Sequence, residues 1–192
     1  MSDIALFRVL LLHIGAIRQT VSRFSCYFGE MEPWLSGTLT GVHPVPRAVL
    51  HCFEQARADL DSWTAGLTPE QLWARPLGLG PAGFHIRHAA RSIDRLFTYV
   101  QGGLLDEAQM HLLGTEMEAG ASREELLDEF GRVTGRVSEQ LRALDPAKLE
   151  EARGVGRKQL PSTVAGLLIH IAEHTQRHVG EAIVTVRVLK AL

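Results

Sequence analysis

Apolar residues recur every three or four positions along four long stretches of this chain. That spacing is typical of amphipathic helices, which bury one face against their neighbours. Outside these stretches no segment shows the alternation of a strand, and we expect no strand, internal repeat or low-complexity tract. The pattern therefore predicts an all-α fold, an antiparallel four-helix bundle. The expected helices cover residues 46–66, 81–101, 122–144 and 162–189.

The ends of these stretches carry ordinary helix signals. Pro46 suits the first turn of a helix, and the glycine pair at Gly102 is a stop. Ser122 begins a Ser-Arg-Glu-Glu capping box, and Ser162 or Thr163 caps the last helix. A shorter helical piece is expected after Thr68, followed by a loop that is rich in glycine and proline.

The first thirty residues lack a pattern that we can assign to the bundle. We therefore expect an extension at 1–30 and a bundle domain at 31–192. Two alternatives stay open for the extension: a poorly ordered segment, which an upstream start codon would add, or an extra helix from Ile4 to about Ser22.

Length, charge and composition narrow the class of protein. A chain of 192 residues suits one domain with a substantial core. The net charge of −2 argues against a nucleic-acid surface, and two cysteines are too few for a disulfide framework. The sequence contains no run of about 18 apolar residues, so we expect no membrane-spanning helix. We therefore expect a cytoplasmic protein that binds neither nucleic acid nor membrane.

Three histidines follow one another at intervals of four residues on the last helix: His170, His174 and His178. A helical wheel places His174 and His178 in or at the edge of the apolar stripe, and His170 at its margin. A buried imidazole without a partner costs about 1–3 kcal/mol. Either a shared metal ion or hydrogen bonds within the core would satisfy the pair, and the spacing alone leaves both alternatives open.

A mononuclear site would need a third ligand from another helix. The second helix offers His85 and His88. The wheel for that helix puts His85 closer than His88 to the centre of its apolar stripe, so geometry alone favours His85. The second helix could be covered on both faces, which would change this preference.

At these residues the sequence resembles the DinB-like superfamily of metal-binding four-helix proteins, over about residues 34–192. The resemblance implies one divalent metal ion, with His88, His174 and His178 as its ligands. Many relatives have Gly-Gln shortly after the last histidine, whereas this chain has Gly-Glu, so Glu181 could orient His178, approach the metal or take part in catalysis. The motifs that carry the resemblance are Phe84-His85-Ile86-Arg87-His88-Ala89-Ala90-Arg91-Ser92 and His170-Ile171-Ala172-Glu173-His174-Thr175-Gln176-Arg177-His178-Val179-Gly180-Glu181.

The resemblance also implies classes of activity. Some relatives transfer small thiols such as bacillithiol, mycothiol or glutathione, so we expect a metal-dependent thiol S-transferase with zinc, nickel or iron and a small-molecule substrate. Arg91 and Arg95 could bind an anionic thiol or substrate; the alternative is a solvated helix face. A homodimer is expected because relatives often form one. Two other readings stay open: a metal-binding stress-response protein without catalysis, and a helical interaction module with structural histidines.

Overall fold

A computed structural model of the chain describes residues 31–192. The predictions for residues 1–30 lie outside the described residues. Residues 31–36, with the short 3-10 helix η1 (Pro33–Leu35), belong to a separate unit from Gly37–Leu192. The fold described below is that of the second unit.

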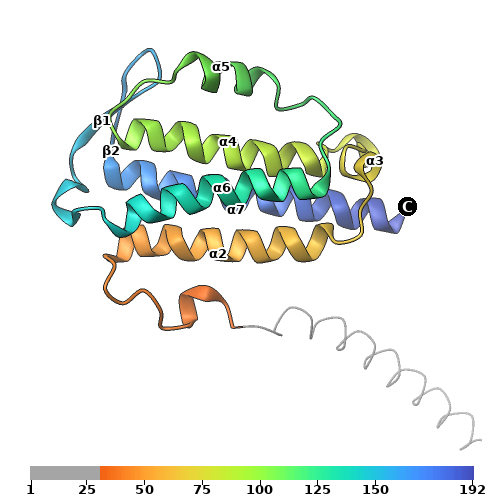
Figure 1. Ribbon diagram of the computed structural model, residues 1–192, viewed down its shortest axis with the longest axis horizontal. Coiled ribbons are helices and arrows are strands. Elements are labelled where there is room, and N and C mark those ends of the chain that lie inside the picture. Colours follow the sequence, from red (N-terminus) through yellow and green to blue (C-terminus); the bar gives the residue numbers. More distant parts are fainter. Residues whose placement is uncertain (1–30) are drawn as a thin grey trace, which may run out of the picture. The chain divides into compact units, whose positions relative to one another are not determined.

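Four long helices form a four-helix bundle, as the apolar spacing predicted (Figure 1). The first begins at Pro44 rather than Pro46, because the ring of His43 caps it by accepting a hydrogen bond from the backbone N–H of Val45. The four helices are α2 (Pro44–Thr64), α4 (Ala82–Val100), α6 (Arg123–Arg142) and α7 (Val164–Ala191).

The helices pack in the cyclic order α2, α7, α4, α6. Antiparallel neighbours are α4 with α7, and α2 with α6, whose first residue Arg123 bonds Asp61 near the end of α2. After α4 the chain returns along the outside of the bundle through α5 (Glu107–Gly114) before α6 begins (Figure 1). As a result α4 and α6 run in the same direction, and Gln101 and Gln140 at their carboxyl ends share a hydrogen bond.

The core lies between the four apolar stripes. Leu50, Ile86, Phe130 and Ile171, one from each long helix, are at most 2% exposed. Burying a side chain of this size contributes about 1.5–3 kcal/mol, which is what holds four helices of only moderate intrinsic propensity together.

Short connections are fixed by local hydrogen bonds. Capping boxes start α3 (Pro69–Leu72), α5 and α6, each with a side-chain oxygen on the third backbone N–H and a reciprocal bond back. The 3-10 helix η2 (Pro76–Gly78) leads into α4, and η3 (Pro146–Lys148) follows α6. None of the helices in the described part is long and apolar enough to cross a membrane.

The expectation of no strand was wrong for the link between α6 and α7. Strands β1 (Ala152–Val155) and β2 (Leu160–Thr163) form an antiparallel hairpin with Val155 opposite Leu160. The turn uses Gly156 at φ 68° and Gln159 at φ 49°. Four-residue strands are too short to show alternation in the sequence, and the two glycines made the segment read as a loop.

Candidate metal centre

The structure brings His88, His174 and His178 together on the inner faces of α4 and α7. Each ring offers a nitrogen, and these three nitrogens lie within 4.8 Å of one another. The ring centre of His178 is 4.3 Å from that of His88 and 4.6 Å from that of His174. All three rings are partly buried, so their open side faces solvent while the bundle surrounds the rest.

His174 and His178 are uncharged near neutral pH. Burial, followed by the neighbouring imidazoles, lowers the pKa of His174 and of His178 to about 4. A neutral imidazole is the form that binds a metal ion. His174 and His178 therefore present lone pairs rather than positive charges, and they suit a divalent cation.

The ring of His88 is held by Glu116, which lies on the segment that follows α5. Its Oε2 is 2.6 Å from Nδ1 of His88, and its Oε1 accepts a hydrogen bond of 2.6 Å from Arg95. Burial raises the pKa of the Glu116 carboxyl, but the bonds from His88 and Arg95 outweigh burial and hold the pKa below its usual range. Glu116 is thus a carboxylate at neutral pH.

This contact decides the tautomer of His88. A carboxylate can only accept, so Nδ1 of His88 carries a hydrogen, and Nε2 is the nitrogen left to bind a cation. Nε2 lies 3.2 Å from Oγ of Ser92, whose oxygen accepts a further hydrogen bond from Arg95. A carboxylate behind a histidine is the usual way in which proteins orient a metal-binding imidazole.

Sequence reasoning missed Glu116. It comes 28 residues after His88, on a segment outside the four predicted helices, so neither periodicity nor motif spacing points to it. Its only signal in the sequence is indirect. The second helix carries several donor side chains, and any of them that are buried need carboxylate or carbonyl acceptors from other segments: Arg87, His88, Arg91 and Arg95.

The second helix is covered on more sides than its apolar stripe suggests, so both of its histidines are brought near α7. His85 is buried, and its Nδ1 lies 3.1 Å from Nδ1 of His178 and 3.0 Å from Oε2 of Glu181. The same Glu181 oxygen is 3.1 Å from Nδ1 of His178. Glu181 therefore faces two imidazoles, and its predicted catalytic role stays a prediction.

The arginines of α4 are engaged within the protein. Arg91 binds Glu129 at 2.7 Å, and Arg95 binds Glu116. Arg87 donates to three backbone carbonyls between Thr115 and Glu118. The alternative of a solvated face is wrong for Arg95, which is 9% exposed, and Arg87 is buried to a similar degree, at 8%. A contact of Arg91 and Arg95 with an anionic ligand stays a prediction.

His170 stays apart from this cluster, as its place at the margin of the wheel suggested. Its side chain is 46% exposed, and its Nδ1 is 3.8 Å from Oε2 of Glu173. Its ring centre is 5.5 Å from that of His174. The geometry therefore does not place His170 among the three close nitrogens.

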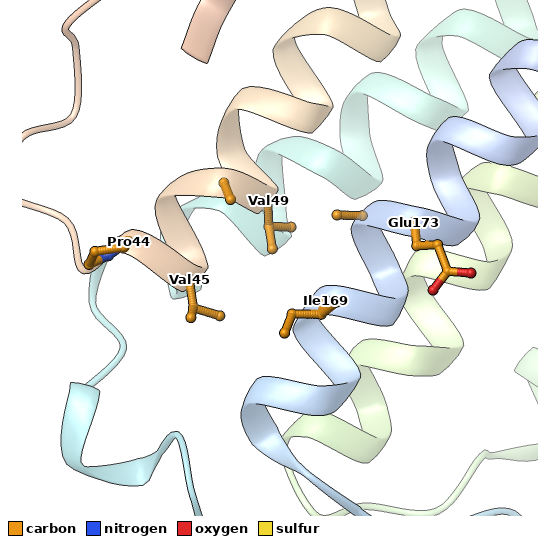
Figure 2. Close-up of a pocket in the computed structure, with 7 residues that line it drawn as sticks. Pro44, Val45, Val49, Ile169 and Glu173 are labelled. Carbon is orange, nitrogen blue, oxygen red and sulfur yellow. The ribbon is translucent and has the colours of Figure 1, made fainter. Parts of the chain in front are cut away.

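A hollow of about 410 Å³ opens elsewhere, between the first turns of α2 and α7 (Figure 2). Its lining is apolar, with Val45, Val49 and Ile169 among its residues, and Glu173 supplies its one carboxylate. None of its lining residues is a histidine. Metal or acid–base chemistry needs several polar groups that converge, so we place the candidate site at the histidines rather than in this hollow.

Comparisons with known proteins identify the family of the chain. The sequence model of the DinB superfamily matches residues 53–182, a range that contains every histidine of the cluster. No curated protein matches the chain significantly.

Solved structures share the fold at low sequence identity. A protein from Bacillus subtilis, YfiT, is described as a probable metal-dependent hydrolase with an unusual four-helix bundle topology; it is 17% identical, with a TM-score of 0.58 over 74% of this chain and 86% of that one. A conserved protein from Enterococcus faecalis is 15% identical, with a TM-score of 0.63 over 79% and 100%. A DinB-like protein from Bacillus cereus is 16% identical, with a TM-score of 0.56 over 72% and 89%.

Proposed function

Because this chain belongs to the DinB superfamily, we propose that it is a metal-dependent protein in which His88, His174 and His178 hold one divalent cation. The observation that carries the proposal is the convergence of three ring nitrogens within 4.8 Å. Two of these rings are neutral at physiological pH, and the third is oriented by a buried carboxylate. The neutral state of two rings and the fixed orientation of the third both favour binding of a cation.

The donor set limits the choice of metal. Three imidazoles suit zinc, nickel or ferrous iron, whereas calcium and magnesium prefer oxygen ligands. Three protein ligands also leave at least one coordination position open, which is the arrangement of catalytic rather than purely structural sites.

The activity that we propose is activation of a small thiol, as in an S-transferase that uses bacillithiol, mycothiol or glutathione. A divalent cation at this position would lower the pKa of a thiol that it binds and so present a thiolate. The residues of the chain have three roles: His174 and His178 supply donors from one helix, Glu116 fixes the ring of His88, and the apolar neighbours exclude bulk water from the inner side.

A second candidate is hydrolysis of a small substrate. It is favoured by the structural likeness to the Bacillus subtilis protein described as a probable metal-dependent hydrolase. The same histidines would then activate water instead of a thiol. The two candidates differ in the nucleophile that binds at the open position.

The test begins with metal content. We expect the protein, purified without a histidine tag, to retain tightly bound zinc, nickel or iron, and the His174→Ala/His178→Ala double variant to lose it. Loaded protein is then assayed with electrophiles in the presence and absence of each thiol. Turnover that requires a thiol supports the transferase, and thiol-independent hydrolysis supports the second candidate. Failure of the wild type to bind any of the three metals would overturn both.

A further inference from the structure

Beside the three histidines lies a second, smaller set of donor atoms. Nδ1 of His85, Nδ1 of His178 and Oε2 of Glu181 form a nearly equilateral triangle with separations of 3.0, 3.1 and 3.1 Å. These separations are within the range of hydrogen bonds. The question is whether hydrogen bonds alone can account for all three.

Counting hydrogens shows that they cannot. The carboxylate has no hydrogen to give, and each Nδ1 carries at most one. If both nitrogens are protonated, the contact between His85 and His178 brings two N–H groups together. If only one is protonated, the other nitrogen meets the Glu181 oxygen with lone pairs on both sides. One side of the triangle therefore always lacks a hydrogen bond, which is costly for the two imidazoles, whose side chains are 9% and 13% exposed.

A cation removes this conflict, because all three atoms can then direct lone pairs at one point. Zinc binds imidazole nitrogen and carboxylate oxygen at about 2.0–2.2 Å, so neighbouring ligands of a tetrahedral zinc ion lie about 3.3 Å apart. The observed separations are close to this value. We propose that His85, His178 and Glu181 form a second position for a divalent cation of the zinc type, adjacent to the histidine triad.

The ring of His85 is fixed in the orientation that this position needs. Its Nε2 packs against the backbone of Gly80 so closely that a Cβ at Gly80 would lie 2.6 Å from it. The carbonyl of Gly80 is in turn tied to α7 by a hydrogen bond of 3.0 Å from Thr185. Phe84 meets the ring of His85 edge to face, with ring centres 5.1 Å apart. Nδ1 is thus the nitrogen that remains to face α7.

The second position differs from the first in its charge and its access. It contains a carboxylate, and the side chain of Glu181 is 48% exposed, so its outer side is open to solvent. Two nitrogens and one exposed carboxylate bind zinc less tightly than a more enclosed set, so we expect this position to fill after the triad and to empty first on dialysis.

The inference rests on the proposed function only through His178, which belongs to both sets. Filling both positions at once would require each ring nitrogen of His178 to bind one cation, with loss of the ring proton to solvent. His88 and His174 belong to the triad alone, whereas His85 and Glu181 belong to the second position alone. Variants can therefore separate the two.

The experiment is a zinc titration of metal-free, full-length protein by calorimetry, with the zinc that remains after gel filtration measured by mass spectrometry. We expect two equivalents in the wild type and one in the His85→Leu/Glu181→Gln variant. The His88→Ala/His174→Ala variant should also bind one, through the second position. Circular dichroism checks that each variant is folded. If His85→Leu prevents folding, the single variant Glu181→Gln, which changes an exposed side chain, replaces the double variant.

Each outcome bears on one proposal or the other. A single wild-type equivalent that is lost with His88 and His174 and unaffected by His85→Leu/Glu181→Gln overturns the second position and leaves the proposed function intact. A single equivalent that is lost only with His85 and Glu181 supports the second position and overturns the triad. No bound zinc in the wild type overturns both.

Discussion

Glu116 accepts hydrogen bonds from two groups of α4 at once. Its two oxygens accept separate bonds of 2.6 Å from His88 and Arg95, and its side chain is 5% exposed. A charge-assisted hydrogen bond of this kind is roughly twice as strong as a neutral one. The carboxylate therefore both orients a proposed metal ligand and compensates a buried guanidinium.

Replacing Glu116 should weaken metal binding without removing a ligand. We expect Glu116→Gln to lower zinc affinity about 10- to 100-fold, because an uncharged amide with one acceptor oxygen replaces a carboxylate that accepts from both His88 and Arg95, and so holds the ring of His88 less firmly. Competition against a chromophoric chelator measures the change. Glu118→Gln is the matched control: its side chain is exposed, and only its backbone carbonyl contacts α4. Equal affinities for the two variants would remove the orienting role of Glu116.

The histidines of α7 should make the metal-free protein sensitive to acid. The pKa of His174 and of His178 is about 4 when folded, below the ordinary value of 6.5. Between these values the unfolded chain binds more protons than the folded chain, so the free energy of unfolding falls as pH falls from about 6.5 to 4. Below that window the loss caused by these two groups is complete and changes no further.

Thermal unfolding of metal-free protein at pH 7 and pH 5 tests this effect. We expect the melting temperature of the wild type to fall more between the two values than that of a His174→Gln/His178→Gln variant, which has no imidazole to protonate at these positions. The same fall in both proteins would show that other groups control acid sensitivity.

At the scale of elements, caps and periodicity predicted most of what is seen. The capping boxes at Thr68 and Ser122 begin α3 and α6 where the sequence placed them. The spacing of four residues on α7 put His174 and His178 on one face, and the structure has them there. The hairpin after α6 was missed because its register depends on a turn geometry that four-residue strands do not encode.

The loop before α4 sets the position of a ring on α4, because Gly80 lies close against His85. We expect Gly80→Ala to push the ring of His85 away from α7, because a Cβ would lie 2.6 Å from Nε2. The second zinc equivalent should then bind at least about tenfold more weakly, while the first is unchanged. Calorimetry separates the two steps.

Gly135→Ala on α6 is the matched control for that change. A Cβ there meets nothing within 4 Å, so zinc binding should be unaffected. Its removal of an exposed helical glycine should stabilise the protein by about 1 kcal/mol. If both variants bind zinc alike, the packing of Gly80 does not control the ring of His85.

At the scale of the whole molecule, the site exists because α4 and α7 run antiparallel and meet along their inner faces. Each helix could be predicted by itself, but their meeting depends on the chain's return through α5, which also delivers Glu116. That is why the shared face of His174 and His178 could be foreseen from spacing, whereas the wheel of α4 alone did not show that both His85 and His88 approach α7. The dimeric state stays a prediction.

A ligand set divided between two helices couples metal binding to the stability of the bundle. A cation that binds only the folded chain stabilises it by RT ln(1 + [L]/Kd), or about 2.7 kcal/mol at a hundredfold excess over Kd. For a chain of this length we expect zinc to raise the melting temperature by about 5–10 °C. His88→Ala should reduce that rise, because it removes the one triad ligand on α4 and leaves only the weaker position formed by His85, His178 and Glu181 to join the two helices. His111→Ala, at an exposed position on α5, should keep it. A rise of the same size in the His88→Ala variant would mean that zinc stabilises the protein without joining the two helices through the triad.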